Sequence, residues 1–332
     1  MILQIYKKLF LTTWVQIRDF FLYVFRQAII VNGYVDDHIW KGIRHRNWGD
    51  DLNYYYLRKL TGRPVVFYHN FKLAKWLHLK NYLCIGTLLD AAGYASKETI
   101  VWGSGVSGMD RSFISPRRIL AVRGKKTNFF CDRYKVACPE VYGDPALLLP
   151  LVYQPGAPKE LINKKTHHEY VKDNSISREE NMKGNVKKQY RLGIIPHVMD
   201  QQHPVIKEIR ERYSEMILII DLAHYGKWTD VIDQICSCER ILSSSLHGLI
   251  ASDAYHIPNA WIELSGNIAG GHFKYFDYAS SVERTWEKPV KIDSVEDLYN
   301  IHTDCASPEV IAQLQKGLIE SCPFKIKLGV EV

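Results

Sequence analysis

The stretch Arg240-Ile241-Leu242-Ser243-Ser244-Ser245-Leu246-His247-Gly248 joins a short apolar run to three hydroxyl side chains, a histidine and a glycine. Its apolar part predicts a buried strand, residues 249–255 predict the helix that follows, and the run 259–264 predicts the next strand. Ligands of open α/β sheets bind at the carboxyl ends of strands, and helix N-termini attract anions. The stretch is therefore a candidate anion site, with the alternative that the serines only cap the helix and His247 is a buried structural histidine.

Short apolar runs and helical stretches alternate along most of the chain. The predicted strands lie at 65–68, 82–87, 99–105 and 119–124 in the first half, and at 191–197, 216–221, 240–242 and 259–264 in the second. Continuous apolar runs of this length are typical of parallel strands that helices cover on both faces. The predicted fold class is α/β, with two Rossmann-like, doubly wound domains that face a cleft.

Changes in composition divide the 332 residues into five predicted segments, and this length is sufficient for two domains. They are an N-terminal amphipathic helical segment (1–35), an N-terminal Rossmann-like domain (36–153), a polar linker (154–190), a C-terminal Rossmann-like domain (191–306) and a C-terminal helix that packs back on the body (307–332). The linker is predicted because it is dense in Lys, Glu, His and Asn and has few apolar residues.

The composition is that of an ordinary globular protein, with 46% hydrophobic and 24% charged residues and a net charge of +7. This charge suits an anionic substrate or a membrane surface, and no run of basic residues interleaved with aromatics predicts a nucleic-acid partner. The seven cysteines are scattered, and Cys236-Ser237-Cys238 lacks the spacing of a zinc or redox motif. We therefore expect reduced thiols, no metal and a cytoplasmic location.

Residues 1–30 are rich in Leu, Ile, Phe, Trp and Tyr, but five charged residues interrupt them. The five are Lys7, Lys8, Arg18, Asp19 and Arg26. The interruptions argue against a transmembrane helix, and no small-residue cleavage site follows that would indicate a signal peptide. Two interpretations stay open: an amphipathic helix on the inner face of the cytoplasmic membrane, or an ordinary helix packed on the first domain.

Three places in the first half carry unusual residues at predicted strand ends or helix starts. Asn47-Trp48-Gly49-Asp50 opens a helix, either as a functional loop or as an N-cap with a structural tryptophan. The loop 103–108, which contains Gly105, could bring backbone N–H groups near an anion, although it lacks a nucleotide-binding fingerprint. Arg123 follows a predicted strand, where it could bind a phosphate or carboxylate or form a surface salt bridge.

Two further places lie in the second half. Residues 195–200 end a predicted strand with His197 and Asp200 close together, as a site or as an exposed turn. The glycine-led, aromatic stretch 270–278 carries Lys274, which could meet an anion or remain solvated. No pattern places a general base beside the three serines, so we do not expect a serine nucleophile.

Taken in order, six blocks of the sequence resemble the polysaccharide pyruvyl transferase family. They are Asn47-Trp48-Gly49-Asp50-Asp51-Leu52-Asn53, Val122-Arg123-Gly124, Tyr142-Gly143-Asp144-Pro145-Ala146, Gly193-Ile194-Ile195-Pro196-His197, Ser244-Ser245-Leu246-His247-Gly248 and Phe273-Lys274-Tyr275-Phe276-Asp277-Tyr278. They cover roughly residues 45–280, so the resemblance leaves out the N-terminal segment.

The resemblance implies a two-domain fold similar to that of GT-B glycosyltransferases, with the acceptor on the N-terminal domain and the donor on the C-terminal domain. It implies transfer of the enolpyruvyl group of phosphoenolpyruvate, as co-substrate and with no other cofactor, onto two hydroxyls of a sugar. The product is a pyruvate ketal on a cell-surface polysaccharide, such as a capsule or exopolysaccharide, or on its lipid-linked precursor.

The resemblance also suggests roles for individual residues. His247 is expected to act as general acid or to contact the departing phosphate, because the unperturbed pKa of histidine lies near neutral pH. Asp50 is its expected catalytic partner and, with Asp144, binds or deprotonates sugar hydroxyls. The family has an arginine two residues before the histidine, where this chain has Ser245. The remaining predicted substrate-binding residues are Arg123, Ser244, Leu246, Lys274, His197, Asn47 and Gly105.

Two alternatives remain open. One is a nucleotide-sugar-dependent GT-B glycosyltransferase, for which Glu263 is the nearby candidate to bind a ribose. The other is a glycan-assembly protein with a defective donor site, and Ser245 is the residue that motivates it.

Overall fold

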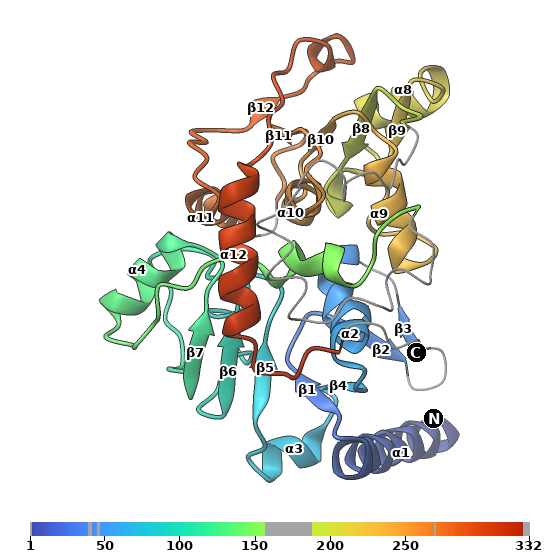
Figure 1. Cartoon of the computed structure of the whole chain (residues 1–332). Coiled ribbons are helices and arrows are strands. Elements are labelled where there is room, and N and C mark those ends of the chain that lie inside the picture. The colour runs from blue at the N-terminus through green and yellow to red at the C-terminus, as the bar shows by residue number, and fades with distance from the viewer. Residues whose placement is uncertain (1, 39–41, 45–46, 157–187, 269, 328–332) are drawn as a thin grey trace.

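A computed structural model describes residues 2–38, 42–44, 47–156, 188–268 and 270–327 (Figure 1). The helices of these ranges are α1 (Ile2–Arg26), α2 (Trp48–Thr61), α3 (Lys72–Trp76), α4 (Lys125–Arg133), α8 (Pro204–Arg212), α9 (Trp228–Cys236), α10 (Leu246–Ala254), α11 (Phe273–Ser281) and α12 (Pro308–Glu320), with the 3-10 helices η1 (Pro145–Leu151), η2 (Val198–Asp200) and η3 (Glu296–Leu298). The strands are β1 (Ile29–Val31), β2 (Asp36–His38), β3 (Gly42–Arg44), β4 (Val65–Phe67), β5 (Asn81–Leu83), β6 (Thr99–Trp102), β7 (Arg118–Ala121), β8 (Leu192–Ile195), β9 (Ile217–Ile219), β10 (Ile241–Ser243), β11 (Asn259–Glu263) and β12 (Val290–Lys291).

Ten of these strands form two parallel five-stranded sheets, one in each half of the chain, and β2 and β3 form an antiparallel pair. The first has the order β4-β1-β5-β6-β7 and the second β12-β11-β10-β8-β9. Figure 1 shows the first sheet in the lower half of the molecule and the second in the upper half, each with helices beside it. The predicted α/β class with two Rossmann-like parallel sheets is confirmed, whereas the likeness to the GT-B arrangement stays a prediction.

The N-terminal segment differs from its prediction. Helix α1 ends at Arg26, and Ile29–Val31 form the buried strand β1 between β4 and β5. The prediction that residues 1–35 are a helical segment is therefore wrong at its C-terminal end. A three-residue apolar strand that follows an apolar helix almost directly has too little sequence to show its own periodicity. Most of the predicted linker, residues 157–187, lies outside the described residues.

Helix α2 begins at Trp48, directly after Asn47, in agreement with the prediction that this stretch opens a helix. The side chain of Asn47 accepts a hydrogen bond from the Gly49 N–H at 3.2 Å, which caps the helix N-terminus. Asp50 and Asp51 in the first turn favour the positive end of the helix dipole. Gly62, with φ of 65°, ends the helix in the left-handed conformation that glycine adopts most easily. The N-cap interpretation of Asn47 is confirmed.

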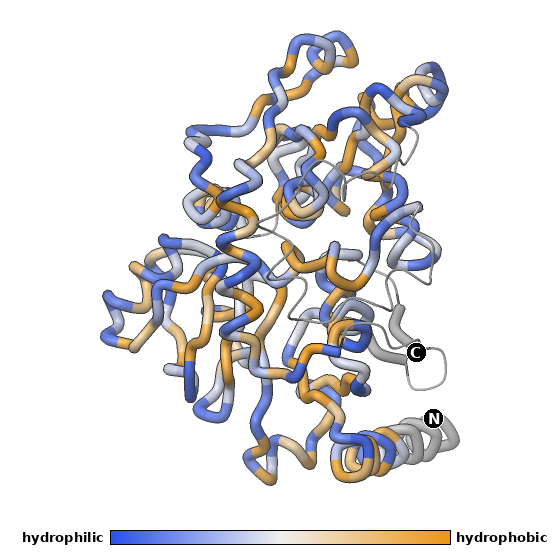
Figure 2. The backbone as a smooth tube through the Cα atoms, in the orientation of Figure 1, coloured by the Kyte–Doolittle hydropathy of each residue, from blue (hydrophilic) through white to orange (hydrophobic). Residues whose placement is uncertain are grey.

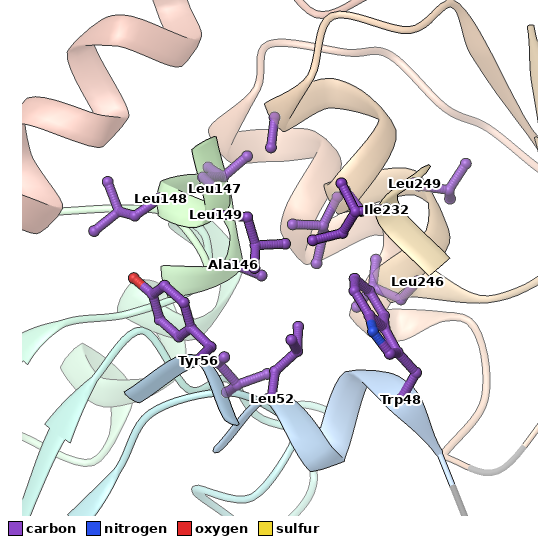
Figure 3. Close-up of a cluster of buried hydrophobic side chains, with 14 of the residues drawn as sticks. Trp48, Leu52, Tyr56, Ala146, Leu147, Leu148, Leu149, Ile232, Leu246 and Leu249 are labelled. Atoms are coloured by element: carbon purple, nitrogen blue, oxygen red, sulfur yellow. The ribbon is translucent and has the colours of Figure 1, made fainter. Parts of the chain in front are cut away.

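The two halves share one hydrophobic core. Figure 3 shows Trp48 and Leu52 of α2 in one cluster with Ile232 of α9 and with Leu246 and Leu249 of α10. Burial of a large apolar side chain stabilises a fold by about 1.5–3 kcal/mol. Contacts in this cluster therefore stabilise the docking of the two halves, in addition to the buried clusters that lie within each half.

Hydrogen bonds at the junction, which is the region where the two halves meet, set the positions of α2 and α12. The indole N–H of Trp48 donates to the carbonyl of Trp228 at 2.8 Å, and the hydroxyl of Tyr225 donates to Asp51 at 2.6 Å. At the other end of the chain, the indole N–H of Trp102 donates to the carbonyl of Leu318 in α12 at 3.0 Å. Helix α12 thus packs on the first half, after the chain has completed the second sheet (Figure 1).

Across the ranges that the structure describes, no helix is both long enough and apolar enough to cross a membrane.

Candidate active site

Several predicted site residues meet where the N-terminus of α2 faces the N-terminus of α10. Gly49 lies directly against the ring of His247, because a Cβ atom at position 49 would be only 1.9 Å from His247 Nδ1. Asp50 is next in the chain, and its Oδ1 lies 3.7 Å from the position of a Cβ on Gly86. This close approach explains why a glycine stands between Asn47, the helix cap, and Asp50.

His247 is buried and neutral. It is 8% exposed, and within the described residues its Nε2 has no hydrogen-bond partner. Burial, together with the positive charges of Lys274 and Arg123, lowers the pKa of His247 to about 3. The expectation of a histidine acid poised near neutral pH is therefore wrong for this structure, because desolvation and two nearby cations both disfavour the imidazolium.

The carboxyl groups of Asp50 and Asp144, and not the imidazole of His247, have pKa values near neutral pH. Burial, and next the charge of Asp51, raise the pKa of Asp50 to about 7, while Lys274 opposes this shift. Burial also raises the pKa of Asp144 to about 7. Asp50 keeps part of its surface exposed, whereas Asp144 is fully buried and its Oδ1 accepts the Ala146 N–H at 2.9 Å. Protons near neutral pH therefore reside on aspartates, and Asp50 is the more accessible of the two.

Lys274, in the first turn of α11, brings a positive charge into the same region. Burial and then the charge of Arg123 lower the pKa of Lys274 to about 8, and Asp50 raises it. The ammonium group lies 5.5 Å from the ring centre of Tyr275, whose hydroxyl donates to the carbonyl of Ser244 at 2.7 Å. The prediction that Lys274 faces an anion site fits this position, because it remains mostly protonated at neutral pH next to His247.

Arg123 makes internal contacts in this structure. It is fully buried, and its Nε and Nη2 both lie 2.9 Å from Asp277 Oδ2 in α11. Its Nη1 donates to Thr87 Oγ1 at 2.7 Å, and Nη2 donates to the carbonyl of Val106 at 3.0 Å. The alternative of a surface salt bridge is therefore wrong, since the ion pair is buried and joins the two halves, whereas contact of Arg123 with a substrate anion stays a prediction.

The loop 103–108 is not an anion cradle. The N–H groups of Gly105, Val106 and Ser107 donate to acceptors of the protein, and the expectation that this loop offers them to an anion is wrong for that reason. The pairs are Gly105 N–H with Gly86 O (3.1 Å), Val106 N–H with Thr127 Oγ1 (3.2 Å) and Ser107 N–H with Asp90 Oδ2 (2.9 Å). Gly105 instead makes room for Arg123, because a Cβ there would lie 2.4 Å from the guanidinium carbon.

His197 and Ser244 form a second group of donors beside β10. The backbone N–H of His197 donates to Ser244 Oγ at 2.8 Å, and its Nδ1 accepts the Met199 N–H at 3.4 Å. Burial, and then the charge of Lys274, lower the pKa of His197 to about 4. A neutral ring whose Nδ1 accepts a hydrogen bond carries its proton on Nε2. His197 therefore offers a neutral N–H donor near Lys274.

Ser245 and Leu246, which were predicted to bind substrate, lie at the start of α10. Ser245 is the N-cap of α10, but its hydroxyl makes no capping hydrogen bond. The alternative that the serines only cap the helix therefore does not hold for Ser245. The side chain of Leu246 packs in the core next to Trp48 (Figure 3). Leu246 contributes at most its backbone N–H to a ligand.

Asp277 is a residue of this region that the local sequence pattern did not indicate. Besides Arg123, its carboxylate accepts the backbone N–H of Thr127 at 2.8 Å and the hydroxyl of Thr127 at 2.7 Å, and so it caps α4 from the other half. The sequence did contain a signal for it in its helical spacing, because Asp277 follows Lys274 by three residues. Residues three apart on a helix lie on the same face, so this spacing places Asp277 near Lys274.

Glu263, the candidate for a nucleotide ribose, has a partner within the protein. Its Oε2 lies 2.6 Å from Nε2 of His272. Within the described ranges, no group of three or more His, Cys, Asp or Glu side chains has an arrangement that could hold a metal ion.

The chain is similar in sequence to a family of known proteins. Residues 18–266 match the family model of polysaccharide pyruvyl transferases, which is about three quarters of the chain. The chain belongs to this family. The chain is also 25% identical over 287 residues to the uncharacterized protein L143 of Acanthamoeba polyphaga mimivirus, with 83% of this chain and 88% of that protein covered. No solved structure matches the chain.

Replacement of Asp277 tests the ion pair that joins the two halves of the protein. Asp277→Ala leaves the Arg123 guanidinium buried without its carboxylate, so we expect the free energy of unfolding to fall by about 3–5 kcal/mol in urea titrations. Asp293→Ala is the control, because Asp293 pairs with Lys291 at the surface and its loss costs less than about 1 kcal/mol. Equal stabilities of the two variants would contradict the role of the pair.

Proposed function

We propose that this transferase moves the enolpyruvyl group of phosphoenolpyruvate onto two hydroxyls of a sugar and forms a pyruvate ketal. The acceptor is a cell-surface polysaccharide or its lipid-linked precursor. The observation that carries the proposal is the junction itself, where the charge of Lys274 acts on both the neutral His247 and the protonatable Asp50. Membership of the family supports a transferase that acts on polysaccharide.

The donor is recognised by one cation and two neutral imidazoles in this proposal. Phosphoenolpyruvate carries a phosphate and a carboxylate, which require cations or N–H donors. Lys274 supplies the charge, and His197 and His247 supply ring nitrogens. Ser245 replaces the arginine of the family, so Lys274 carries more of the anion binding here. A bound dianion raises the pKa of nearby imidazoles, which allows His247 to share a proton with the phosphate as it departs.

The proton balance of the reaction assigns a role to Asp50. The methylene carbon of phosphoenolpyruvate gains one proton, C2 forms bonds to two sugar oxygens, and the C–O bond to phosphate breaks. The two hydroxyls release two protons, of which one replaces the proton given to the methylene and the other leaves with phosphate. A group that gives and takes a proton works best with a pKa near the working pH. Asp50 meets this condition, because burial, and next the charge of Asp51, raise its pKa to about 7.

A cytoplasmic location is part of the proposal. All seven cysteines are free thiols, which is the state expected in a reducing compartment.

Turnover with phosphoenolpyruvate separates this function from the two alternatives. We expect phosphate release that depends on a glycan acceptor, together with an acceptor mass gain of one pyruvate ketal. Release of a nucleoside diphosphate from a nucleotide sugar would instead indicate a glycosyltransferase. Absence of any thermal shift with phosphoenolpyruvate would indicate a protein without a donor site.

Asp50→Asn tests the proton-transfer role. We expect kcat to fall by roughly 10²–10⁴-fold, because the amide cannot give or take a proton. In the unchanged enzyme, the pKa of about 7 means that the protonated form of Asp50 is lost as the pH rises through neutrality, so kcat declines there. The variant should lose this pH dependence. Asp132→Asn, an exposed carboxyl on α4, is the matched control. Near-normal turnover of Asp50→Asn would rule the role out.

Lys274→Gln tests donor binding. Loss of a charge-assisted hydrogen bond costs about 1.5–3 kcal/mol, which corresponds to about a 10- to 100-fold higher Kd for phosphoenolpyruvate by calorimetry. The affinity of the unchanged protein should decline above pH 8, because the pKa of Lys274 is about 8 and its charge is lost there. Lys288→Gln, at an exposed position of the same half, serves as control. An unchanged Kd for Lys274→Gln would contradict the assignment.

A further inference from the structure

Helix α1 turns an apolar face toward solvent. Six large hydrophobic side chains occupy this face, and Phe25, at 67%, is the most exposed of them. They are Trp14, Ile17, Phe20, Phe21, Val24 and Phe25. With 3.6 residues per turn, their spacing places all six on one side of the helix. A helix that only packed on the first domain would direct such residues inward, so this face has a use other than folding.

The orientation of α1 is set by its opposite side. Val15 and Asp19 are buried there, and Gln16 forms two hydrogen bonds with the segment of α3. Its Nε2 donates to the carbonyl of Asn70 at 2.7 Å, and its Oε1 accepts the Leu73 N–H at 3.1 Å. The apolar face therefore points outward because polar contacts hold the other side against the domain.

The exposed surface continues from α1 onto the end of α3. Trp76 is 75% exposed and Leu77 follows it. Helices α1 and α3 lie side by side at the lower end of the molecule in Figure 1, and Figure 2 shows hydrophobic residues along α1 there. Of the sixteen exposed large hydrophobic residues in the described chain, eight belong to these two elements. We call the six residues of α1 with Trp76 and Leu77 the α1–α3 face.

The border of the α1–α3 face is basic. Arg26, Lys72, Lys75 and Lys80 are exposed around it. In the segments 13–35 and 68–80, the only acidic residue is Asp19, which is buried and lies 2.7 Å from Arg18. A partner for this face must therefore supply negative charge around an apolar centre.

We propose that the α1–α3 face docks on an anionic lipid surface, with α1 parallel to the membrane plane. Aromatic side chains enter the boundary between headgroups and acyl chains, and basic side chains bind anionic headgroups. A second copy of the chain fits less well, because a two-fold contact would bring the four basic residues against their own copies. The proposal does not depend on the reaction that the protein catalyses.

Vesicle co-sedimentation of the full-length protein tests the apolar part. We expect binding to phosphatidylcholine vesicles that contain phosphatidylglycerol and weaker binding to phosphatidylcholine alone. Ile17→Ser/Phe21→Ser/Phe25→Ser should weaken the partition by about 100-fold or more, because three apolar side chains no longer enter the lipid. Ile114→Ser/Phe129→Ser is the control, since both residues are equally exposed elsewhere.

A second variant tests the charges and does not touch α1. Lys72→Gln/Lys75→Gln/Lys80→Gln should lower binding to the anionic vesicles by about fivefold per lysine, while Lys207→Gln/Lys288→Gln/Lys325→Gln should leave it unchanged. The proposal is overturned if the unchanged protein ignores anionic vesicles, or if the serine variant binds them normally. It is also overturned if light scattering finds a dimer that the serine variant converts to a monomer, since the face would then join two copies.

Discussion

The buried ion pair between Arg123 and Asp277 is the interaction on which the arrangement of the two halves depends. Arg123 follows the first sheet, and Asp277 lies on a helix of the second half, so the pair exists only when the halves are docked. Burial of two charges is costly unless all donors and acceptors are satisfied. Thr87, Val106 and Thr127 complete the set, which makes the relative position of the halves specific.

The electrostatics of the junction follow from this pair and from burial. Desolvation lowers the pKa values of Lys274 and His247, with the charge of Arg123 as a further cause, and it raises those of Asp50 and Asp144. The result is a site in which histidine is neutral and a carboxyl group holds the exchangeable proton. Burial in a low-dielectric junction, rather than residue type, decides which group is suited to acid–base chemistry.

The α1–α3 face and the junction lie at different places on the first half. Helix α1 contacts β4 and α3, whereas the junction forms at α2 and the loops after β5 and β6 (Figure 1). The first half thus presents a hydrophobic, basic exterior at one end and the proposed site at the other. An enzyme that acts on membrane-linked glycans would benefit from such a division, since docking leaves the junction open to its acceptor.

The sequence alone determined the α/β class, the positions of most strands and the family, because apolar runs and ordered motifs are local features. It also indicated Lys274 and Asp50, which carry unusual charge at helix starts. It did not reveal the strand at Ile29, the internal use of Arg123 or the neutral state of His247. Each of these depends on partners distant in the chain: β4 and β5, Asp277, and the cations around the imidazole. Local pattern specifies which groups are available, whereas their protonation and pairing depend on desolvation and neighbours that only the tertiary structure supplies.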